Sequence, residues 1–273
     1  MFGTNSEANS MSAKERMTLL DALVASGIDP SRMMPGTGCC SLTETIELTA
    51  HAVKHGCAGL LMLPPFYYKN ISEEGLYRYF SEVVQRVGDT RLKIYLYHIP
   101  PVAIVRFTPN LVERLLKVYP TAIAGMKDSS GDWNNTKTFL DAFAETDRAG
   151  RTFDVFVGSE SFLLANMRNG GVGTISATAN VNPAAIHKLY KEWNTADDAH
   201  QQQERLNVVR EVFSNRKFPS MIAALKQAIA IHAKDPEWTR VRPPLVELTT
   251  DQAKLLATEL QGIGFAMPLE RKN

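Results

Sequence analysis

The stretch IYLYHIPP at residues 94–101, followed by AIAGMKDSSGD at residues 122–132, decides the fold of this chain. Each segment contains a short apolar run, and Thr108 followed by Pro109 between them is typical of a helix N-cap and first helical position. Two apolar runs joined by an amphipathic helix form a β/α unit with parallel, buried strands. The second run closes on Lys127, so a cation directly follows a buried strand.

The same alternation of apolar runs and amphipathic stretches continues through most of the chain. Ser12 with Glu15 and Ser41 with Glu44 have the spacing of capping boxes at the starts of two further helices. Beyond about residue 182 the strand pattern stops and helical patterns follow. We expect six parallel strands, at residues 32–34, 58–63, 93–97, 123–127, 153–157 and 173–177.

The number of strands bears on the fold class. A closed barrel of β/α units needs eight strands, and the Gly-rich turn of an open nucleotide-binding sheet does not follow the first strand. The chain opens on MFGTNSE, which has the pattern of a strand end that leads into a polar loop. We therefore predict a (β/α)8 TIM barrel at residues 1–213 that lacks its first β/α unit in this sequence, with a C-terminal helical region at residues 214–273.

Composition excludes several classes of function. The 273 residues include 30 Lys and Arg and 29 Asp and Glu without a block of like charges, so nucleic acid and membrane surfaces are poor partners. The 3 cysteines form no CxxC pair and are too few for a disulfide framework. No apolar stretch approaches the roughly 18 residues of a membrane span, and the first residues lack the features of a signal peptide. We expect a soluble, cytoplasmic protein.

The motif HAVKH places His51 and His55 one helical turn apart, as in zinc proteases. No glutamate follows His51, and the sequence indicates no third ligand. The prediction is therefore a solvated helix face and no metal site.

Lys127 is the residue whose position indicates chemistry. The C-terminal ends of barrel strands form the active face, and burial there favours a neutral amine over the ammonium ion. A neutral amine attacks ketones and forms an imine, which withdraws electrons from the substrate. A lysine at a strand end can also extend into solvent. Tyr97 ends the preceding strand, so we expect its phenol beside Lys127, where it can transfer protons.

Five segments carry a resemblance to a known family: GTNSE at 3–7, PPFYYKNISEEGLY at 64–77, YHIP at 97–100, GMKDSSGD at 125–132 and GVGTISATANV at 171–181. In this order and spacing they resemble the dihydrodipicolinate synthase and N-acetylneuraminate lyase family of Schiff-base, pyruvate-dependent aldolases. The resemblance covers residues 3 to about 193, and a helical tail of the expected length follows.

The resemblance implies a role for each matching residue. Lys127 would form the imine with the keto carbon of pyruvate, and Tyr97 would carry protons beside it. Thr4 would link Tyr97 to Tyr68, a tyrosine that the family supplies across a subunit interface. The substrate-binding residues that the resemblance implies are Thr4, Asn5, Gly158, Ser159, Glu160 and Ile175. It also implies catalysis without a metal or organic cofactor, and assembly into homodimers or homotetramers.

Three departures bear on the substrate. The synthases that make the lysine precursor carry an arginine for the carboxylate of the aldehyde, and here that position is Val102. Loss of a charge-assisted contact costs a few kcal/mol, or about a hundredfold, so this reaction is disfavoured. Asn5 favours the 4-hydroxy-2-oxoglutarate aldolase branch. His98 stands where many members carry asparagine, and we expect the backbone to satisfy its ring.

The leading hypothesis is thus a lyase that joins or separates pyruvate, or the pyruvoyl part of a 2-oxo acid, and an aldehyde. Three alternatives stay open: a 4-hydroxy-tetrahydrodipicolinate synthase, a hydratase-aldolase or sugar-acid dehydratase of the same family, and a non-catalytic truncated paralogue that serves as an assembly subunit. The last follows from the expected absence of one β/α unit, because an open barrel exposes strand edges.

Overall fold

The computed structural model describes residues 1–143 and 153–267. The chain divides into two compact units. Unit 1 comprises Met1–Gly158 with Asn169–Val172, and unit 2 comprises Ser159–Arg168 with Gly173–Asn273. The predicted division at residue 213 lies inside a helix of unit 2, Ala199–Ser214, and stays a prediction.

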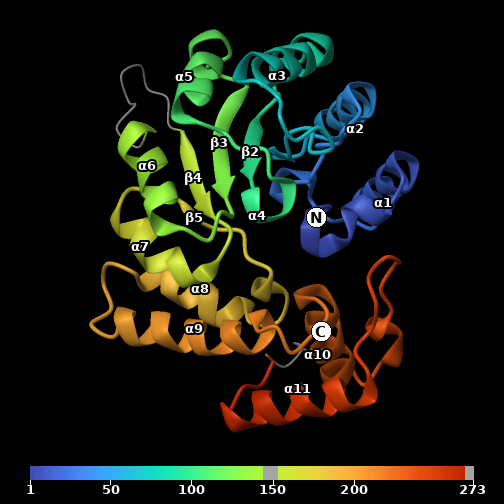
Figure 1. Cartoon of the computed structure of the whole chain (residues 1–273), viewed down its shortest axis with the longest axis vertical. Coiled ribbons are helices and arrows are strands. Elements are labelled where there is room, and N and C mark those ends of the chain that lie inside the picture. Colours follow the sequence, from blue (N-terminus) through green and yellow to red (C-terminus); the bar gives the residue numbers. More distant parts are fainter. Residues whose placement is uncertain (144–152, 268–273) are drawn as a thin grey trace. The chain divides into compact units, whose positions relative to one another are not determined.

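The centre of unit 1 is a parallel sheet whose strands follow one another in chain order (Figure 1). Its strands are β1 (Leu60–Met62), β2 (Ile94–His98), β3 (Ile123–Asp128) and β4 (Asp154–Val157). Every residue of β1 and β2 is buried, as continuous apolar runs predict. The expected parallel strands at 58–63, 93–97, 123–127 and 153–157 are therefore confirmed, with ends that differ by one or two residues.

Helices connect the strands of unit 1 and pack beside one another in chain order. They are α1 (Ala13–Ala25), α2 (Leu42–Lys54), α3 (Glu73–Val87), α4 (Pro100–Ala103), α5 (Pro109–Val118) and α6 (Trp133–Phe143). The predicted caps are confirmed: Ser12 forms a capping box, Ser41 accepts from the backbone N–H of Glu44, and Thr108 caps α5. Side chains of the helices and strands, Phe80, Leu111 and Met126 among them, share one buried apolar core.

The strand predicted at residues 32–34 is wrong. A 3-10 turn, Pro30–Arg32, takes up the first of these residues, because Asp29 accepts the backbone N–H of Ser31 and caps the turn. Residues 33 and 34 follow it in no regular element. Pairing of this segment with β1 begins later in the chain, where Gly36 forms an isolated parallel bridge with Leu61. A Cβ on Gly36 would lie 2.1 Å from the carbonyl oxygen of Phe2, so only glycine fits here.

Unit 2 is mainly helical. It contains the short strand β5 (Gly173–Thr174) and the helices α7 (Leu163–Arg168), α8 (Pro183–Glu192), α9 (Ala199–Ser214), α10 (Met221–Ala233) and α11 (Thr250–Gly262). Phe213, Leu225 and Leu256 join α9, α10 and α11 in one buried cluster. Of the described residues beyond 182, those in regular elements are helical, which confirms the predicted change of pattern. Within residues 1–143 and 153–267 no helix is both long and apolar enough for a membrane span.

Candidate active site

Tyr97 and Lys127 lie side by side at the carboxyl ends of β2 and β3. The two residues are directly paired in the register of the sheet. The Lys127 Nζ lies 4.2 Å from the centroid of the Tyr97 ring. Both residues are buried, with exposed fractions of 5% and 3%. The predicted adjacency is confirmed, and the amine of Lys127 is held beside an aromatic face and away from bulk solvent.

Thr4 completes this arrangement from a distant part of the sequence. The hydroxyl groups of Thr4 and Tyr97 share a hydrogen bond of 3.1 Å. Thr4 begins the 3-10 turn Thr4–Ser6, which ends at Glu7 with a left-handed φ of 53°. Asn5 lies in the same turn and is half-buried. The structure therefore brings Thr4, Tyr97 and Lys127 together within unit 1.

A hollow adjoins the hydroxyl pair. Its lining combines the polar groups of Thr4 and Tyr97 with apolar and glycine residues: Phe2, Gly3, Ala8, Asn9, Gly36, Gly38, Leu61 and Leu63. The hollow measures about 10 Å³, which is room for about one water molecule.

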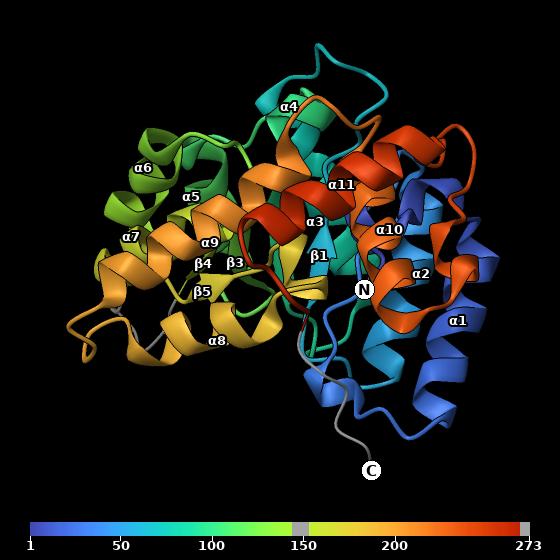
Figure 2. The ribbon, with the colours of Figure 1, turned by 90° about the horizontal axis from the view of Figure 1, so that it is seen from below.

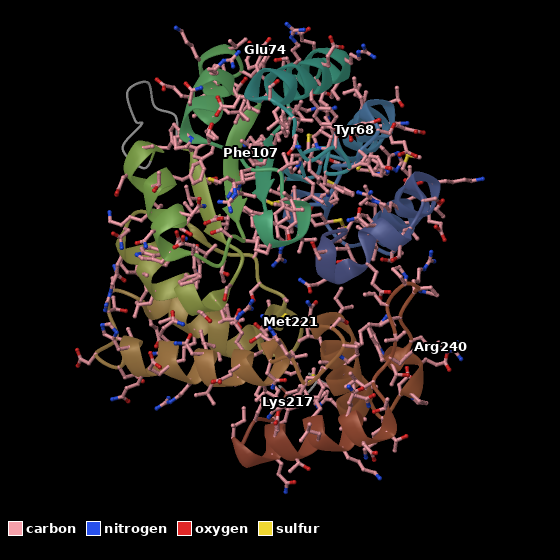
Figure 3. The ribbon with its side chains drawn as sticks, viewed as in Figure 1. Tyr68, Glu74, Phe107, Lys217, Met221 and Arg240 are labelled. Atoms are coloured by element: carbon pink, nitrogen blue, oxygen red, sulfur yellow. The ribbon has the colours of Figure 1, made fainter. Side chains whose placement is uncertain are left out.

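Tyr68 has a different position. It belongs to the segment between β1 and α3, labelled in Figure 3, and it is 72% exposed. Its ring makes an edge contact with Tyr67, with centroids 5.3 Å apart. The structure does not bring Tyr68 to Thr4 within one chain, so the predicted link between them stays a prediction.

His98, the neighbour of Tyr97, faces the helices instead of the hydroxyl pair. Its Nδ1 accepts the backbone N–H of Phe107 at 3.1 Å, which confirms that the backbone satisfies one side of the ring. Phe107 and Phe139 flank the ring. Burial lowers the pKa of His98, and the nearby carboxylate of Asp128 opposes this effect. The ring is therefore held in its neutral form.

Asp128 is a positioning residue to which the sequence analysis gave no role. Its carboxylate accepts hydrogen bonds from the backbone N–H and hydroxyl of Ser130, each at 2.9 Å, and from Thr136 at 2.5 Å. These bonds fix the turn that follows Lys127. The signal was present in the sequence, because an aspartate two residues before a serine after a strand is typical of an Asx turn.

The remaining predicted site residues lie at or after the end of β4 and β5. Gly158 closes β4, where a Cβ would lie 1.8 Å from the Ser129 Oγ. Ser159 caps the turn Glu160–Phe162 by accepting the N–H of Ser161. Ile175 directly follows β5 and is half-buried. The roles of these residues toward a substrate stay predictions.

Glu160 is the core of a polar cluster within unit 2. It is 1% exposed, and its carboxylate accepts from Arg210 at 2.9 Å and from the hydroxyl groups of Ser176 and Thr178. A buried carboxylate requires such partners. The contacts anchor the segment that carries Ile175, and a contact of Glu160 with a substrate stays a prediction.

Comparisons with known proteins extend these findings. The model of the dihydrodipicolinate synthetase family matches residues 1–263. An uncharacterised DapA-like lyase from Chloroflexus aurantiacus is 32% identical over 263 residues, which are 96% of this chain and 83% of that protein.

Two solved structures are also similar. Dihydrodipicolinate synthase from Agrobacterium tumefaciens has a TM-score of 0.83 and 30% identity, with 96% of this chain and 86% of that chain covered. A prophage protein of the dihydrodipicolinic acid synthase family from E. coli, in complex with pyruvate, has a TM-score of 0.86 and 27% identity, with 97% and 86% covered.

Proposed function

This chain belongs to the dihydrodipicolinate synthetase family, a family of lyases, and on that premise we propose that it makes or breaks a C–C bond between pyruvate and an aldehyde. The pyruvoyl part of a 2-oxo acid serves equally as the first substrate. The observation that carries the proposal is the group of Lys127, Tyr97 and Thr4, in which a buried amine lies beside a hydrogen-bonded phenol.

The proposed reaction begins at the amine of Lys127. Its Nζ attacks the keto carbon of pyruvate, an N–C bond forms, and the keto oxygen leaves as water after proton transfer. The protonated imine then withdraws electrons, so the methyl carbon loses a proton and an enamine forms. The enamine carbon attacks the carbonyl carbon of the aldehyde, whose oxygen takes up a proton. Hydrolysis of the imine releases the product and restores Lys127.

Tyr97 and Thr4 support these steps by moving protons. The Tyr97 phenol lies beside the amine, and its hydroxyl is bonded to Thr4. A positioned phenol of this kind contributes about 10²–10⁴-fold to a proton-transfer step. In the proposal, Thr4 passes protons on to Tyr68 of a second copy of the chain, and Asn5 with Thr4 holds the pyruvate carboxylate.

A second copy of the chain is part of the proposal, as a homodimer or as a homotetramer of paired dimers. Unit 1 exposes large apolar and aromatic side chains near β1 and β2: Tyr67 at 72%, Tyr68 at 72%, Val102 at 61% and Ile104 at 57%. Exposed groups of this type mark surfaces that a partner covers.

The proposal also concerns the identity of the aldehyde substrate. Val102 in α4 presents no charge to a carboxylate, which favours a 4-hydroxy-2-oxoglutarate aldolase-like reaction over the synthase reaction. The name of the Agrobacterium relative supports the synthase as the second candidate. A hydratase-aldolase, a sugar-acid dehydratase and a non-catalytic assembly subunit remain alternatives, as does the prediction of a barrel without its first β/α unit.

Reductive trapping tests the proposal. Borohydride added with pyruvate is expected to leave a pyruvate-sized adduct on Lys127, located by mass spectrometry of peptides. Lys127→Met should abolish the adduct, whereas Lys93→Arg, next to β2, should leave it unchanged. An adduct elsewhere, or none in the folded protein, contradicts the assignment. Release of pyruvate from a panel of 4-hydroxy-2-oxo acids then identifies the aldehyde.

A further inference from the structure

Three side chains of types that can ligate a metal ion converge in unit 1, and none of them belongs to the group of the proposed reaction. Asp21 comes from α1, and His51 and His55 come from the last turn of α2 and its C-cap. Their donor atoms all lie within 4.8 Å of one another. Figures 1 and 2 both show α1 and α2 as neighbours, in agreement with their contacts. Asp21 lies 34 positions before His55, so the local sequence pattern does not indicate it as a third ligand.

We propose that Asp21, His51 and His55 form a binding site for a divalent transition-metal ion, with Zn²⁺ as the best fit. Two imidazoles and one carboxylate are the ligand set that zinc and similar ions select, whereas calcium and magnesium prefer oxygen ligands alone. Histidines four residues apart on a helix point to the same side, so both can reach one ion.

The contacts within the cluster support a metal site over a simple ion pair. The Nε2 atoms of His51 and His55 lie 2.8 Å and 2.7 Å from the same oxygen of Asp21. His55 makes a hydrogen bond with Asp21, and His51 also interacts with the carboxylate. The Nε2 of His51 is shielded from solvent and has no hydrogen-bond partner among the described residues. Such an atom is costly, and coordination to a metal ion satisfies it.

The geometry needs a small adjustment to hold the ion. With Zn–N bonds of about 2.0 Å, neighbouring donors in a tetrahedral site are about 3.3 Å apart. The carboxylate of Asp21 therefore moves outward by about 0.5 Å. The imidazole donors, which are separated by no more than 4.8 Å, also draw closer together. Its side chain is 53% exposed, so this movement is unhindered. The fourth position is then open to water.

The electrostatic surroundings favour a cation. The cluster lies at the C-terminal end of α2, where the helix dipole carries partial negative charge. Two cations lie near the cluster: Lys54, which is exposed in the same turn, and Arg16 of α1, which lines the same hollow as His51.

A bound ion would connect α1 to α2 and stabilise the folded chain in proportion to the zinc concentration. This effect is independent of the lyase reaction, since none of the three residues belongs to the group of Lys127, Tyr97 and Thr4.

Zinc titration of the full-length chain without an affinity tag tests the proposal, with a chromophoric chelator as competitor. We expect one Zn²⁺ per chain, a higher Tm with zinc, and a tetrahedral visible spectrum with Co²⁺. Asp21→Asn, His51→Gln and His55→Gln should each weaken binding by more than about tenfold. Asp21 is exposed, so its variant retains the fold even if His51→Gln does not.

Two matched controls separate this site from the rest of the chain. His187→Gln removes a histidine of α8 and should bind zinc as the unmodified chain does. Lys127→Met should lose the pyruvate adduct and keep zinc binding. The proposal is overturned if the unmodified chain binds no zinc, or if the Asp21, His51 and His55 variants bind it as tightly.

Discussion

The Lys127 Nζ lies 4.2 Å from the centre of the Tyr97 ring, with the two residues paired across neighbouring parallel strands. This relationship joins the proposed nucleophile to the proposed proton carrier. It depends only on the register of β2 and β3, so a shift of one residue would separate the two side chains.

Replacement of Tyr97 by phenylalanine should remove the proton carrier and keep the aromatic ring. We expect kcat to fall by about 10²–10⁴-fold, with the pyruvate adduct on Lys127 still formed more slowly. Tyr95→Phe is the matched control on the same strand, where the hydroxyl donates to Asp154 instead. Steady-state kinetics of both variants test this expectation. An equal fall in kcat in Tyr95→Phe and Tyr97→Phe would contradict a specific role for Tyr97.

The hydroxyl of Thr4 should matter more than its methyl group. Thr4→Val removes the hydrogen bond to Tyr97, and we expect a loss of about 10–100-fold in kcat, whereas Thr4→Ser retains most of the activity. Pre-steady-state measurement of imine formation locates the defect. If valine and serine behave alike, the hydroxyl is not part of the proton path.

Tyr68 should act on the reaction of a second copy. Tyr68→Phe and Lys127→Met should each be impaired alone, because one lacks the phenol and the other the amine. Mixed after reversible dissociation, the two variants should regain partial activity, since a mixed dimer contains one site with both groups. Size-exclusion chromatography checks assembly. Dimers that form without any recovery would show that Tyr68 does not act across an interface.

Val102→Arg should extend the substrate range toward aldehydes that carry a carboxylate. Val102 is 61% exposed in α4, so the longer side chain fits without disturbing the core. A charge-assisted contact between the new guanidinium and the carboxylate of the aldehyde should raise kcat/KM for that aldehyde by about tenfold or more. Val118 is exposed at the end of α5, so Val118→Arg serves as the control and should leave kcat/KM for the carboxylated aldehyde unchanged.

His98 should make stability depend on pH. Because burial lowers its pKa in the folded state, the unfolded chain binds a proton more readily below about pH 6.5. The free energy of unfolding contributed by this group therefore falls as pH decreases. Urea unfolding at pH 7.5 and 5.5 should show a smaller difference for His98→Asn than for the unmodified chain. His187→Asn should keep the original difference.

Much of the fold follows from local patterns. The apolar runs ending at Tyr97 and Lys127 predict β2 and β3, because buried parallel strands are continuous in apolar residues. The caps at Ser12, Ser41 and Thr108 were equally readable, since a cap involves residues only three apart. The error at residues 32–34 has the same origin: a short apolar run does not distinguish a strand from a turn capped by Asp29.

The sequence by itself determined which residues end the buried strands, and so placed Tyr97 and Lys127 at neighbouring positions. Only the tertiary structure decided what meets across long separations in the chain. Thr4 and Tyr97 are 93 positions apart, and Glu160 and Arg210 are 50 positions apart. Asp21, His51 and His55 form a cluster only because α1 packs against α2. Local patterns record burial and backbone conformation, whereas the convergence of side chains depends on how whole elements pack.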